Sequence, residues 1–449
     1  MIQSIAMKRL YILMFITLFL SKGIFSQEKI SPESIKEKMQ WFQDAKLGIF
    51  IHWGIYAVKG VDESWSFYNK LISYDDYMKQ LDGFTASKYN PADWADLVKQ
   101  SGAKYAVMTT KHHDGVALWD TKADHYNVVR NTPAKRDLLA PFFSELRKRD
   151  LKVGTYFSLI DWSRNDYDQF KKDSARYKIK DQPARWESFR KFFQSQIQEI
   201  SSLYNPDLFW FDGDWEHNAD EWESVKVRNN ILKSNSNAII NGRLAGYGDY
   251  VTPEQNIPVA KPSYNWWELC MTINNNWGFQ FRDTNWKKPN EIITLFADVI
   301  GNGGNLLLDI GPKEDGTVPK EQREVLTELG KWNKKHDRAI FGTVAGIAKG
   351  HFYGPTTLSK DSTSLFLFLQ AQTSGPIMIK GLVNRIKDVK VVGSEASLRH
   401  KVVGKISWSP VPGLIFIDVP AKELDSYMTV LELKLEGPVK LYTGHGGFN

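Results

Sequence analysis

The sequence predicts an irregular (β/α)8 barrel followed by an antiparallel β-sandwich, and three observations support this fold class. Short apolar runs alternate with helical segments over roughly the first three hundred residues after the N-terminal stretch. These runs are nearly continuous in apolar residues, as buried parallel strands are. From about residue 343 the pattern changes to short strands separated by Gly, Pro, Ser and Asp, without helical periodicity. Seven buried strands with helices between them favour a barrel over an open sheet.

The individual elements can be located from their composition and their ends. Asn90 and Pro91 begin one helix with a capping side chain and a proline in the first turn, and Gly102 follows its end. Residues 185–204 and 319–336 have helical periodicity. The predicted barrel strands are 48–54, 105–110, 153–159, 207–211, 238–242, 266–273 and 305–312. The predicted sandwich strands are 364–370, 375–381, 389–393, 405–410, 413–419, 428–435 and 439–442.

Residues 1–26 have the pattern of a secretory signal peptide. Lys8 and Arg9 precede an apolar run over residues 10–20, which is shorter than the roughly 20 residues that a membrane-spanning helix needs. No later apolar run is long enough to span a bilayer. We therefore expect an exported protein, periplasmic or secreted, with no membrane span in its mature form. We assign residues 27–342 to the barrel and residues 343–449 to the sandwich.

Composition excludes several classes of function. Residues 1–26 carry three of the basic side chains and no acidic one, so without them the formal net charge falls from +6 to +3. Such a weak and dispersed excess gives no reason to expect a nucleic-acid partner. Cys270 is the only cysteine, which excludes intramolecular disulfides and thiolate metal clusters. The sixteen tryptophans fit a buried core and also carbohydrate sites, where flat rings cover the apolar faces of sugars.

Polar side chains lie at or near the ends of five predicted barrel strands. Barrel enzymes build their active sites at the C-terminal ends of the strands, so we expect these side chains to converge. One histidine at one strand end would carry little weight, whereas five strands with such residues indicate a site. The residues are His52, His112, His113, Tyr156 with Asp161 beyond it, Asp212 and Arg243.

Three interpretations of this set compete. A metal hydrolase would use the histidines and an aspartate, but the HExxH and HxH spacings are absent, so we favour this interpretation least. The histidines could instead tie loops together, which is the better interpretation for any one of them but not for the set. Glycoside hydrolysis needs two carboxyl groups flanking a sugar, with hydrogen-bonding side chains for its hydroxyls and aromatic rings for its apolar parts. The sequence contains each of these components.

Several segments resemble the α-L-fucosidases of glycoside hydrolase family 29, in that family's order and spacing. They are FIHWGIY, TTKHHDGVALW, LFWFDGDW, NGR with the following TPEQ, WWELCMTI and WGF. The resemblance covers about residues 38–345, and KHHDG and FDGDW are its most specific parts. It implies a barrel with an appended sandwich, a retaining mechanism without metal or cofactor, and a fucosylated glycan or oligosaccharide as substrate.

The resemblance also implies roles for the acidic residues. Asp212 occupies the family's nucleophile position, at the exit of its strand, whereas Asp207 lies at the strand's start. Glu254 matches the position at which the family commonly carries its general acid/base. Thr252 and Pro253 before it would also suit a helix start. Glu268, inside an apolar run, is the second candidate for the acid/base and could instead pair with a buried cation.

The remaining site residues follow from the same resemblance. The residues that would bind the sugar are His52, Trp65, His112, His113, Tyr156, Trp210, Arg243 and Trp277. Many relatives place a glutamate directly before the tryptophan that matches Trp65, whereas this chain has Ser64 there and Glu63 one position earlier. Either Glu63 substitutes through a shift of register, or that contact is absent. A glycosidase for a related 6-deoxy or galacto-configured sugar, or a non-catalytic carbohydrate-binding barrel, therefore stays open.

Overall fold

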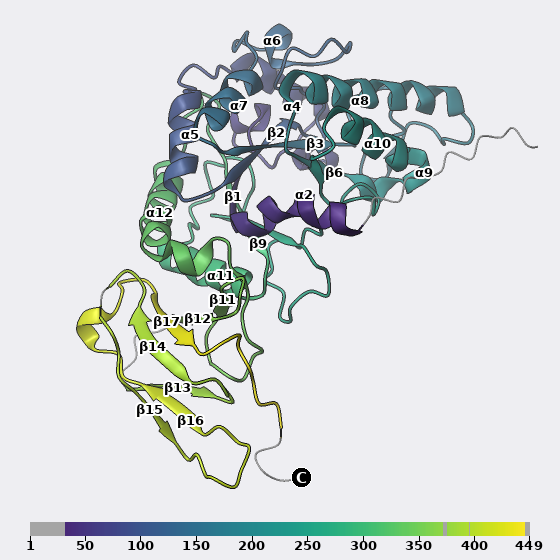
Figure 1. Ribbon diagram of the computed structural model, residues 1–449. Coiled ribbons are helices and arrows are strands. Elements are labelled where there is room, and N and C mark those ends of the chain that lie inside the picture. The colour runs from purple at the N-terminus through teal and green to yellow at the C-terminus, as the bar shows by residue number, and fades with distance from the viewer. Residues whose placement is uncertain (1–31, 371–374, 395, 445–449) are drawn as a thin grey trace, which may run out of the picture. The chain divides into compact units, whose positions relative to one another are not determined.

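Seven parallel strands form the central sheet (Figure 1), in the spatial order β7-β6-β3-β2-β1-β9-β8. The strands are β1 (Leu47–Ile51), β2 (Tyr105–Lys111), β3 (Lys152–Ser158), β6 (Leu208–Asp212), β7 (Ile239–Ile240), β8 (Glu268–Thr272) and β9 (Asn305–Ile310). The computed structural model describes residues 32–370, 375–394 and 396–444. The predicted signal peptide, residues 1–26, lies outside the described residues.

An extended segment after β7 takes the place of a regular eighth strand. Tyr250 pairs with Asn241 beyond β7, and Val251 and Glu254 pair with residues of the β8 region through isolated parallel bridges. The amide of Cys270 donates to the carbonyl oxygen of Pro253 at 3.2 Å. Because Pro253 itself has no N–H to donate, this segment cannot form a full ladder. The predicted irregular barrel is thus confirmed, and its irregularity lies between β7 and β8.

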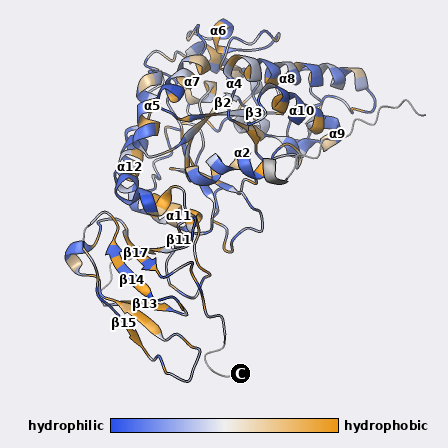
Figure 2. Cartoon of the chain, viewed as in Figure 1, coloured by the Kyte–Doolittle hydropathy of each residue, from blue (hydrophilic) through white to orange (hydrophobic). Residues whose placement is uncertain are grey.

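Helices separate most of the barrel strands along the chain. They are α2 (Pro32–Ala45), α5 (Pro91–Gln100), α7 (Leu139–Lys148), α8 (Pro183–Tyr204), α10 (Ser224–Ser234), α11 (Pro289–Gly301) and α12 (Lys320–Ile340). As predicted, the Asn90 side chain caps α5 by accepting from the amides of Ala92 and Asp93. Figure 2 shows hydrophilic and hydrophobic residues mixed along α8, as expected for a helix with one buried face.

Two antiparallel sheets follow the barrel. One has the order β10-β11-β12-β17-β14 and the other β13-β16-β15. Their bounds are β10 (Val344–Ala345), β11 (Thr356–Leu358), β12 (Ser364–Leu369), β13 (Ile377–Lys380), β14 (Ile386–Val391), β15 (His400–Val403), β16 (Leu414–Ile417) and β17 (Thr429–Leu435). The strand predicted at 405–410 was wrong, since β15 ends at Val403 and the chain turns there. Gly404 and Pro410 favour that turn over a ladder.

The first antiparallel sheet, β10-β11-β12-β17-β14, packs against α12. The indole Nε1 of Trp332 donates to the carbonyl oxygen of Met428 at 2.9 Å, and the Thr357 hydroxyl donates to the carbonyl oxygen of Ala339 at 2.7 Å. Phe368 and Met428 belong to the same buried apolar cluster as the barrel residues. The barrel and the first antiparallel sheet therefore share one continuous core.

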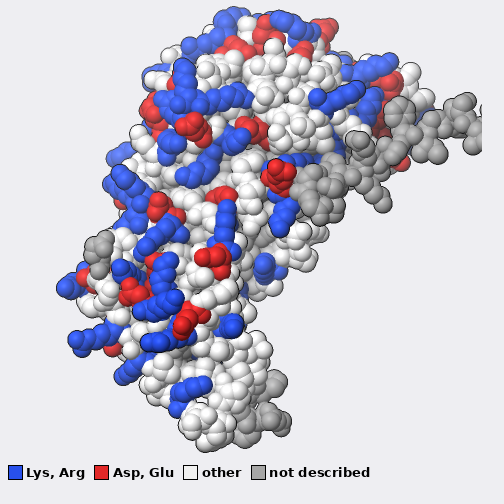
Figure 3. Space-filling model, viewed as in Figure 1, with Lys and Arg blue, Asp and Glu red and all other residues white. Residues whose placement is uncertain are grey.

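Charged side chains are spread over the face drawn in Figure 3. Lysine and arginine occur along the whole of that face with acidic side chains between them, rather than over one element. Within residues 32–370, 375–394 and 396–444, none of the helices has the length and apolar character needed to cross a membrane.

Candidate active site

Asp212 is the last residue of β6 and presents its carboxylate at the C-terminal end of the sheet. Its Oδ2 accepts a 2.9 Å hydrogen bond from the Tyr156 hydroxyl and lies 3.7 Å from Nε2 of His113. Burial raises the pKa of Tyr156 well above its ordinary value, so this phenol stays protonated and donates. Asp212 is thus oriented by Tyr156 on the neighbouring strand β3 and by His113, which follows β2.

Arg243 joins Asp212 to Glu254. One guanidinium nitrogen donates to Oδ1 of Asp212 at 2.9 Å, and another donates to Oε2 of Glu254 at 2.7 Å. Burial disfavours the charge of this arginine, but Asp212 and Glu254 outweigh that effect, and its pKa is raised. The Glu254 side chain is 40% exposed whereas that of Asp212 is 11% exposed. The two carboxyl groups therefore flank one cation, with Glu254 near solvent and Asp212 inside.

The three predicted histidines lie beside this pair, and each has a side-chain partner on Nδ1. His52 contacts Asp309 at 2.7 Å, and His112 contacts Ser64 at 2.6 Å. His113 contacts Ser158, also at 2.6 Å. These contacts leave the Nε2 atom of each ring as the free end, and Nε2 of His113 is the one near Asp212. Polar partners behind a ring fix its orientation, as in metal and catalytic sites generally.

Burial lowers the pKa of all three histidines. The pKa of His52 and that of His112 fall well below the ordinary value, and the pKa of His113 falls to about 3. The imidazoles are therefore neutral at pH 7 and can each donate or accept one hydrogen bond at the free nitrogen. Neutral polar rings suit the hydroxyl groups of an uncharged ligand better than they suit an anion.

A local irregularity of β2 lies just before the two adjacent histidines, which follow the end of this strand. The pairing of β2 with β3 shifts register between Thr109 and Lys111, so Thr110 is an extra residue. Consecutive side chains of a regular strand point to opposite faces, but a bulge can re-aim one of them. The hydroxyl of Thr110 donates to the carbonyl oxygen of Tyr156 at 2.7 Å and anchors the bulge. The rings of His112 and His113 end 4.3 Å apart.

Aromatic rings surround the polar groups. The Trp210 ring stacks on Tyr156 at 5.6 Å between centroids, and the guanidinium of Arg243 lies 4.6 Å from its centre. Trp277 lies 5.0 Å from the ring of His52, and Trp65 lies 5.4 Å from that of His113. The structure therefore brings together the residues that the sequence placed at the site, except Glu268 and Asp161, whose carboxylate pairs with Lys111.

Glu268 lies elsewhere in the barrel, at the start of β8 rather than at its end. Its carboxyl group accepts hydrogen bonds from Tyr105, at the start of β2, from Trp210 at 3.0 Å and from Tyr250 at 3.4 Å. It is fully buried, and burial raises its pKa to about 7. The buried cation considered as its partner is absent from these hydrogen bonds, and its donors are aromatic side chains. Glu268 therefore fixes the position of the Trp210 indole by accepting its hydrogen bond.

The other acids of residues 206–217 have local partners. Asp207 accepts from the Lys152 ammonium at 2.7 Å and from the Val153 amide at 2.9 Å, which ties the starts of β3 and β6 together. Asp214 accepts from the Ala245 amide at 2.7 Å. Glu216 accepts from Nε1 of Trp162 at 3.3 Å and from the Tyr167 hydroxyl. Asp212 is thus the one acid of this stretch that points to the histidines.

Ser64 and Glu63 resolve the departure from the family pattern. Ser64 is buried against His112, as described, while Glu63 accepts from the backbone amide of Gly278, next to Trp277. Burial raises the pKa of Glu63 to about 7. Glu63 therefore contacts the loop that carries Trp277, and Ser64 contacts a site histidine. The hypothesis that Glu63 takes over the missing glutamate's place through a shift of register stays a prediction.

Sequence reasoning missed the residues that hold the histidines in place. Asp309, the partner of His52, lies near the end of the predicted strand 305–312 and is an acid within an apolar run. That position was a usable signal, because the other site residues were found by the same rule. Ser158 and Ser64 gave no such signal, since a serine near a strand end or in a loop is common.

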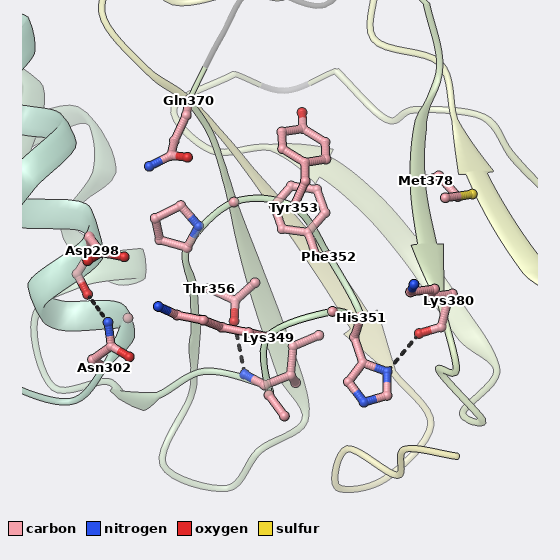
Figure 4. A pocket seen from close by; sticks show the side chains of 16 residues that line it. Asp298, Asn302, Lys349, His351, Phe352, Tyr353, Thr356, Gln370, Met378 and Lys380 are labelled. Carbon is pink, nitrogen blue, oxygen red and sulfur yellow. Dashed lines mark hydrogen bonds between the residues drawn. The ribbon is translucent and has the colours of Figure 1, made fainter. Parts of the chain in front are cut away.

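A separate hollow lies between α11 and the antiparallel sheets (Figure 4). It has a volume of about 510 Å3, and Asp298, Asn302, Tyr353 and Lys380 are among its lining residues. None of the predicted site residues lines it. Within the parts of the chain that the structure describes, no group of three or more His, Cys, Asp and Glu is placed to hold a metal ion.

Two carboxyl groups on one arginine, neutral histidines and aromatic rings at the C-terminal end of a barrel define a glycoside hydrolase. A family model described as Alpha-L-fucosidase matches residues 21–338. The chain belongs to this family, the α-L-fucosidases of glycoside hydrolase family 29. The enzyme class predicted from the resemblance is thereby confirmed.

Known relatives agree with this assignment. Tissue alpha-L-fucosidase of Homo sapiens is 30% identical over 419 residues, which are 85% of this chain and 84% of that protein. Alpha-L-fucosidase isoenzyme 1 from Paenibacillus thiaminolyticus has a TM-score of 0.81 at 30% identity, covering 90% of this chain and all of that one. A GH29 fucosidase from Bacteroides thetaiotaomicron, trapped as a covalent intermediate with 2-fluoro-fucosyl fluoride, has a TM-score of 0.79 at 26% identity, covering 89% of this chain and 96% of that one.

Proposed function

We propose that this enzyme removes terminal α-L-fucosyl residues from glycans or oligosaccharides with retention of configuration, through a glycosyl-aspartate intermediate. The observation that carries the proposal is the bridge from Asp212 through Arg243 to Glu254 at the C-terminal end of the barrel. A retaining glycosidase needs one carboxylate as nucleophile and a second carboxyl group as acid and then base. The pair on Arg243 supplies both.

In the first step, the Asp212 carboxylate attacks the anomeric carbon and forms an ester bond as the glycosidic C–O bond breaks. The Glu254 carboxyl group gives its proton to the leaving oxygen, so the leaving alcohol departs neutral. In the second step, Glu254 takes a proton from water, the hydroxide attacks the same carbon, and the Asp212 carboxylate is released. Free sugar is then released, with Glu254 protonated and Asp212 ionised as at the start.

Glu254 must change partner during this cycle. In the structure its Oε2 accepts a hydrogen bond from Arg243, whereas in the first step this carboxyl group must donate a proton to the leaving oxygen. We therefore infer that the glycosidic oxygen replaces Arg243 at the Glu254 carboxyl group when substrate binds. Hydrogen bonds at a catalytic acid often reach their working geometry only in the substrate complex. The 40% exposure of the Glu254 side chain leaves room for that exchange.

Glu268 is a weaker candidate for the acid because it lies at the opposite end of its strand from the histidines. Its carboxyl group is occupied by three aromatic donors and is fully buried. Trp210 lies between Glu268 and the site, and its indole donates to Glu268. The glycosidic oxygen of a sugar bound at Asp212 would therefore be separated from Glu268 by the Trp210 ring. Glu254 has no such barrier.

Substrates with different leaving groups test this assignment. We expect Glu254→Ala to lower kcat/KM strongly on an oligosaccharide, whose leaving group needs protonation, and far less on an activated aryl α-L-fucoside. The matched control is Glu268→Gln. We expect it to lower kcat/KM for both substrates to the same extent, through its effect on Trp210. Equal losses in Glu254→Ala, with a selective loss in Glu268→Gln, would transfer the acid/base role to Glu268.

A panel of aryl glycosides tests the sugar. The position of Ser64 beside His112, where many relatives carry a glutamate before this tryptophan, is the observation that keeps a related 6-deoxy or galacto-configured sugar under consideration. We expect the α-L-fucoside to be the best substrate of the panel. Fucose binding without turnover of any fucoside would instead indicate a carbohydrate-binding protein.

We also propose that residues 1–26 direct export and are removed, so that the enzyme acts in the periplasm or outside the cell. The order of basic and apolar residues in the sequence supports this. We further propose a boundary between barrel and sandwich at residues 342 and 343, where the sequence changes from helical periodicity to short strands. N-terminal sequencing of the protein from the exported fraction tests the cleavage, and an intact N-terminus would contradict it.

A further inference from the structure

Trp215 is an exposed aromatic side chain at the mouth of the site. It lies in the short helix η3 (Asp214–Glu216), directly after the strand that ends in Asp212, and is 53% exposed. Its ring centre lies 6.0 Å from that of His113, whose Nε2 is 3.7 Å from the Asp212 carboxylate. The proposed mechanism uses neither face of this ring.

Three tryptophans form a row from the core to solvent. Trp162 is fully buried, Trp65 is half-buried, and Trp215 is exposed. The ring of Trp65 lies 5.0 Å from that of Trp162 and 6.2 Å from that of Trp215, which is stacked on it at an interplanar angle of 17°. Trp162 and Trp65 pack against the buried core, whereas the apolar surface of Trp215 is largely exposed to water.

The backbone on both sides of Trp215 is held in place. Asp214 accepts a hydrogen bond from the Ala245 amide at 2.7 Å, and its carbonyl oxygen accepts from Nε1 of Trp222 at 3.0 Å. Glu216, on the other side, accepts from Trp162 at 3.3 Å and from Tyr167. An exposed ring on a fixed backbone loses little conformational entropy when a ligand packs on it. Such pre-organisation is typical of binding residues and is not needed for a solvated surface ring.

We propose that Trp215 is the platform for the sugar ring to which the cleaved fucose is attached. The apolar C–H face of a pyranose packs on an indole, as aromatic rings pack on sugars generally. The leaving group of the preferred substrate is then a pyranose, so the enzyme acts on fucosylated oligosaccharides in preference to fucosides of small alcohols or of amino-acid hydroxyls. This inference rests on the proposed fucosidase activity and names the substrate class of that site.

The test compares two substrates that differ in the leaving group. α-L-Fucosyl fluoride leaves a fluoride ion, which has no ring to pack on Trp215, and a fucosyl-pyranose disaccharide leaves a sugar. We expect Trp215→Ala to lower the ratio of kcat/KM for the disaccharide to kcat/KM for the fluoride by about tenfold, the size of a lost aromatic contact. Trp215→Phe keeps a ring and should restore most of the ratio.

Trp408, 81% exposed in the C-terminal part of the chain, supplies the matched control. Trp408→Ala removes another exposed indole, one outside the site, and should leave the ratio at the wild-type value. An unchanged ratio in Trp215→Ala would overturn the inference, whether both activities fall together or neither falls. Failure of the wild type to hydrolyse fucosyl fluoride would overturn the proposed function itself, which separates the two claims.

Discussion

Glu268 shows how one buried side chain makes stability depend on pH. Burial raises its pKa from the ordinary value of 4.5 to about 7. A carboxyl group with a raised folded-state pKa stabilises the fold while it is protonated, fully below about pH 4.5. That contribution is lost as pH rises through 7. The difference corresponds to roughly 3 kcal/mol of unfolding free energy.

We therefore predict that Glu268→Gln flattens the dependence of stability on pH. An amide cannot ionise, so the variant should lose roughly 3 kcal/mol less than the wild type between pH 4.5 and pH 8. Urea denaturation at the two pH values measures this. Parallel losses in the two proteins would show that Glu268 does not titrate in this range.

At this scale the sequence predicted the residues of the site but not all of their roles. A polar side chain at a strand end is visible in sequence, which is why Asp212, the histidines and Arg243 were found. The resemblance favoured Glu254 over Glu268 as the acid, but the sequence alone does not show which end of the barrel each of these two acids faces. The hydrogen bond from Arg243 to Glu254 gives that direction.

The end of β2 depends on an ion pair beneath the histidines. Lys111 and Asp161 have no exposed side-chain area, and their charged atoms lie 3.3 Å apart. Asp161 also accepts from the Ser163 hydroxyl at 2.6 Å. Burial opposes the charge of Asp161, but Lys111, His125 and Ser163 together outweigh it, and the pKa of the carboxyl group is lowered. The end of β2, directly before His112 and His113, is therefore held by a buried ion pair.

Removing one partner of that pair should destabilise the protein strongly. We predict that Lys111→Met lowers the unfolding free energy by about 3–5 kcal/mol, because the Asp161 charge is left uncompensated. The double variant Lys111→Met with Asp161→Asn should recover part of the loss. Chemical denaturation of the three proteins measures it, and a double variant less stable than Lys111→Met would contradict the explanation.

Element by element, the apolar runs located the barrel strands well and the irregular parts poorly. Strand 238–242 shrinks to β7 (Ile239–Ile240), and the segment around Pro253 replaces an eighth strand. The bulge at Thr110, just before the two histidines, leaves no trace in the hydrophobic pattern. Pairing with a neighbouring strand decides such features, and a single sequence does not contain that pairing.

For the molecule as a whole, the shared core predicts that barrel and sandwich unfold together. Trp332 of α12 is 2% exposed and bonds to Met428 near the start of β17. We predict that Trp332→Ala lowers the unfolding free energy by about 3–5 kcal/mol, the usual cost of removing a buried tryptophan. Differential scanning calorimetry should show one transition in the wild type at a higher temperature than in the variant.

Two separate transitions in the wild type, with only the second one shifted in the variant, would contradict a shared core. The fold class itself was predictable, because the change from helical to short-strand texture near residue 343 is plain in the sequence. The contact between the two parts was not predictable, since Trp332 and Met428 are ordinary members of their own elements.

The most direct test of the central claim is to trap the glycosyl-enzyme. The protein is incubated with 2-fluoro-fucosyl fluoride, digested, and its peptides are fragmented by mass spectrometry. We predict one fluoro-fucosyl group on Asp212, and no label in Asp212→Asn. A label on Asp214, Glu216 or any other residue, or turnover of α-L-fucosyl fluoride with inversion of configuration, would contradict the assignment of Asp212 as the nucleophile of a retaining fucosidase.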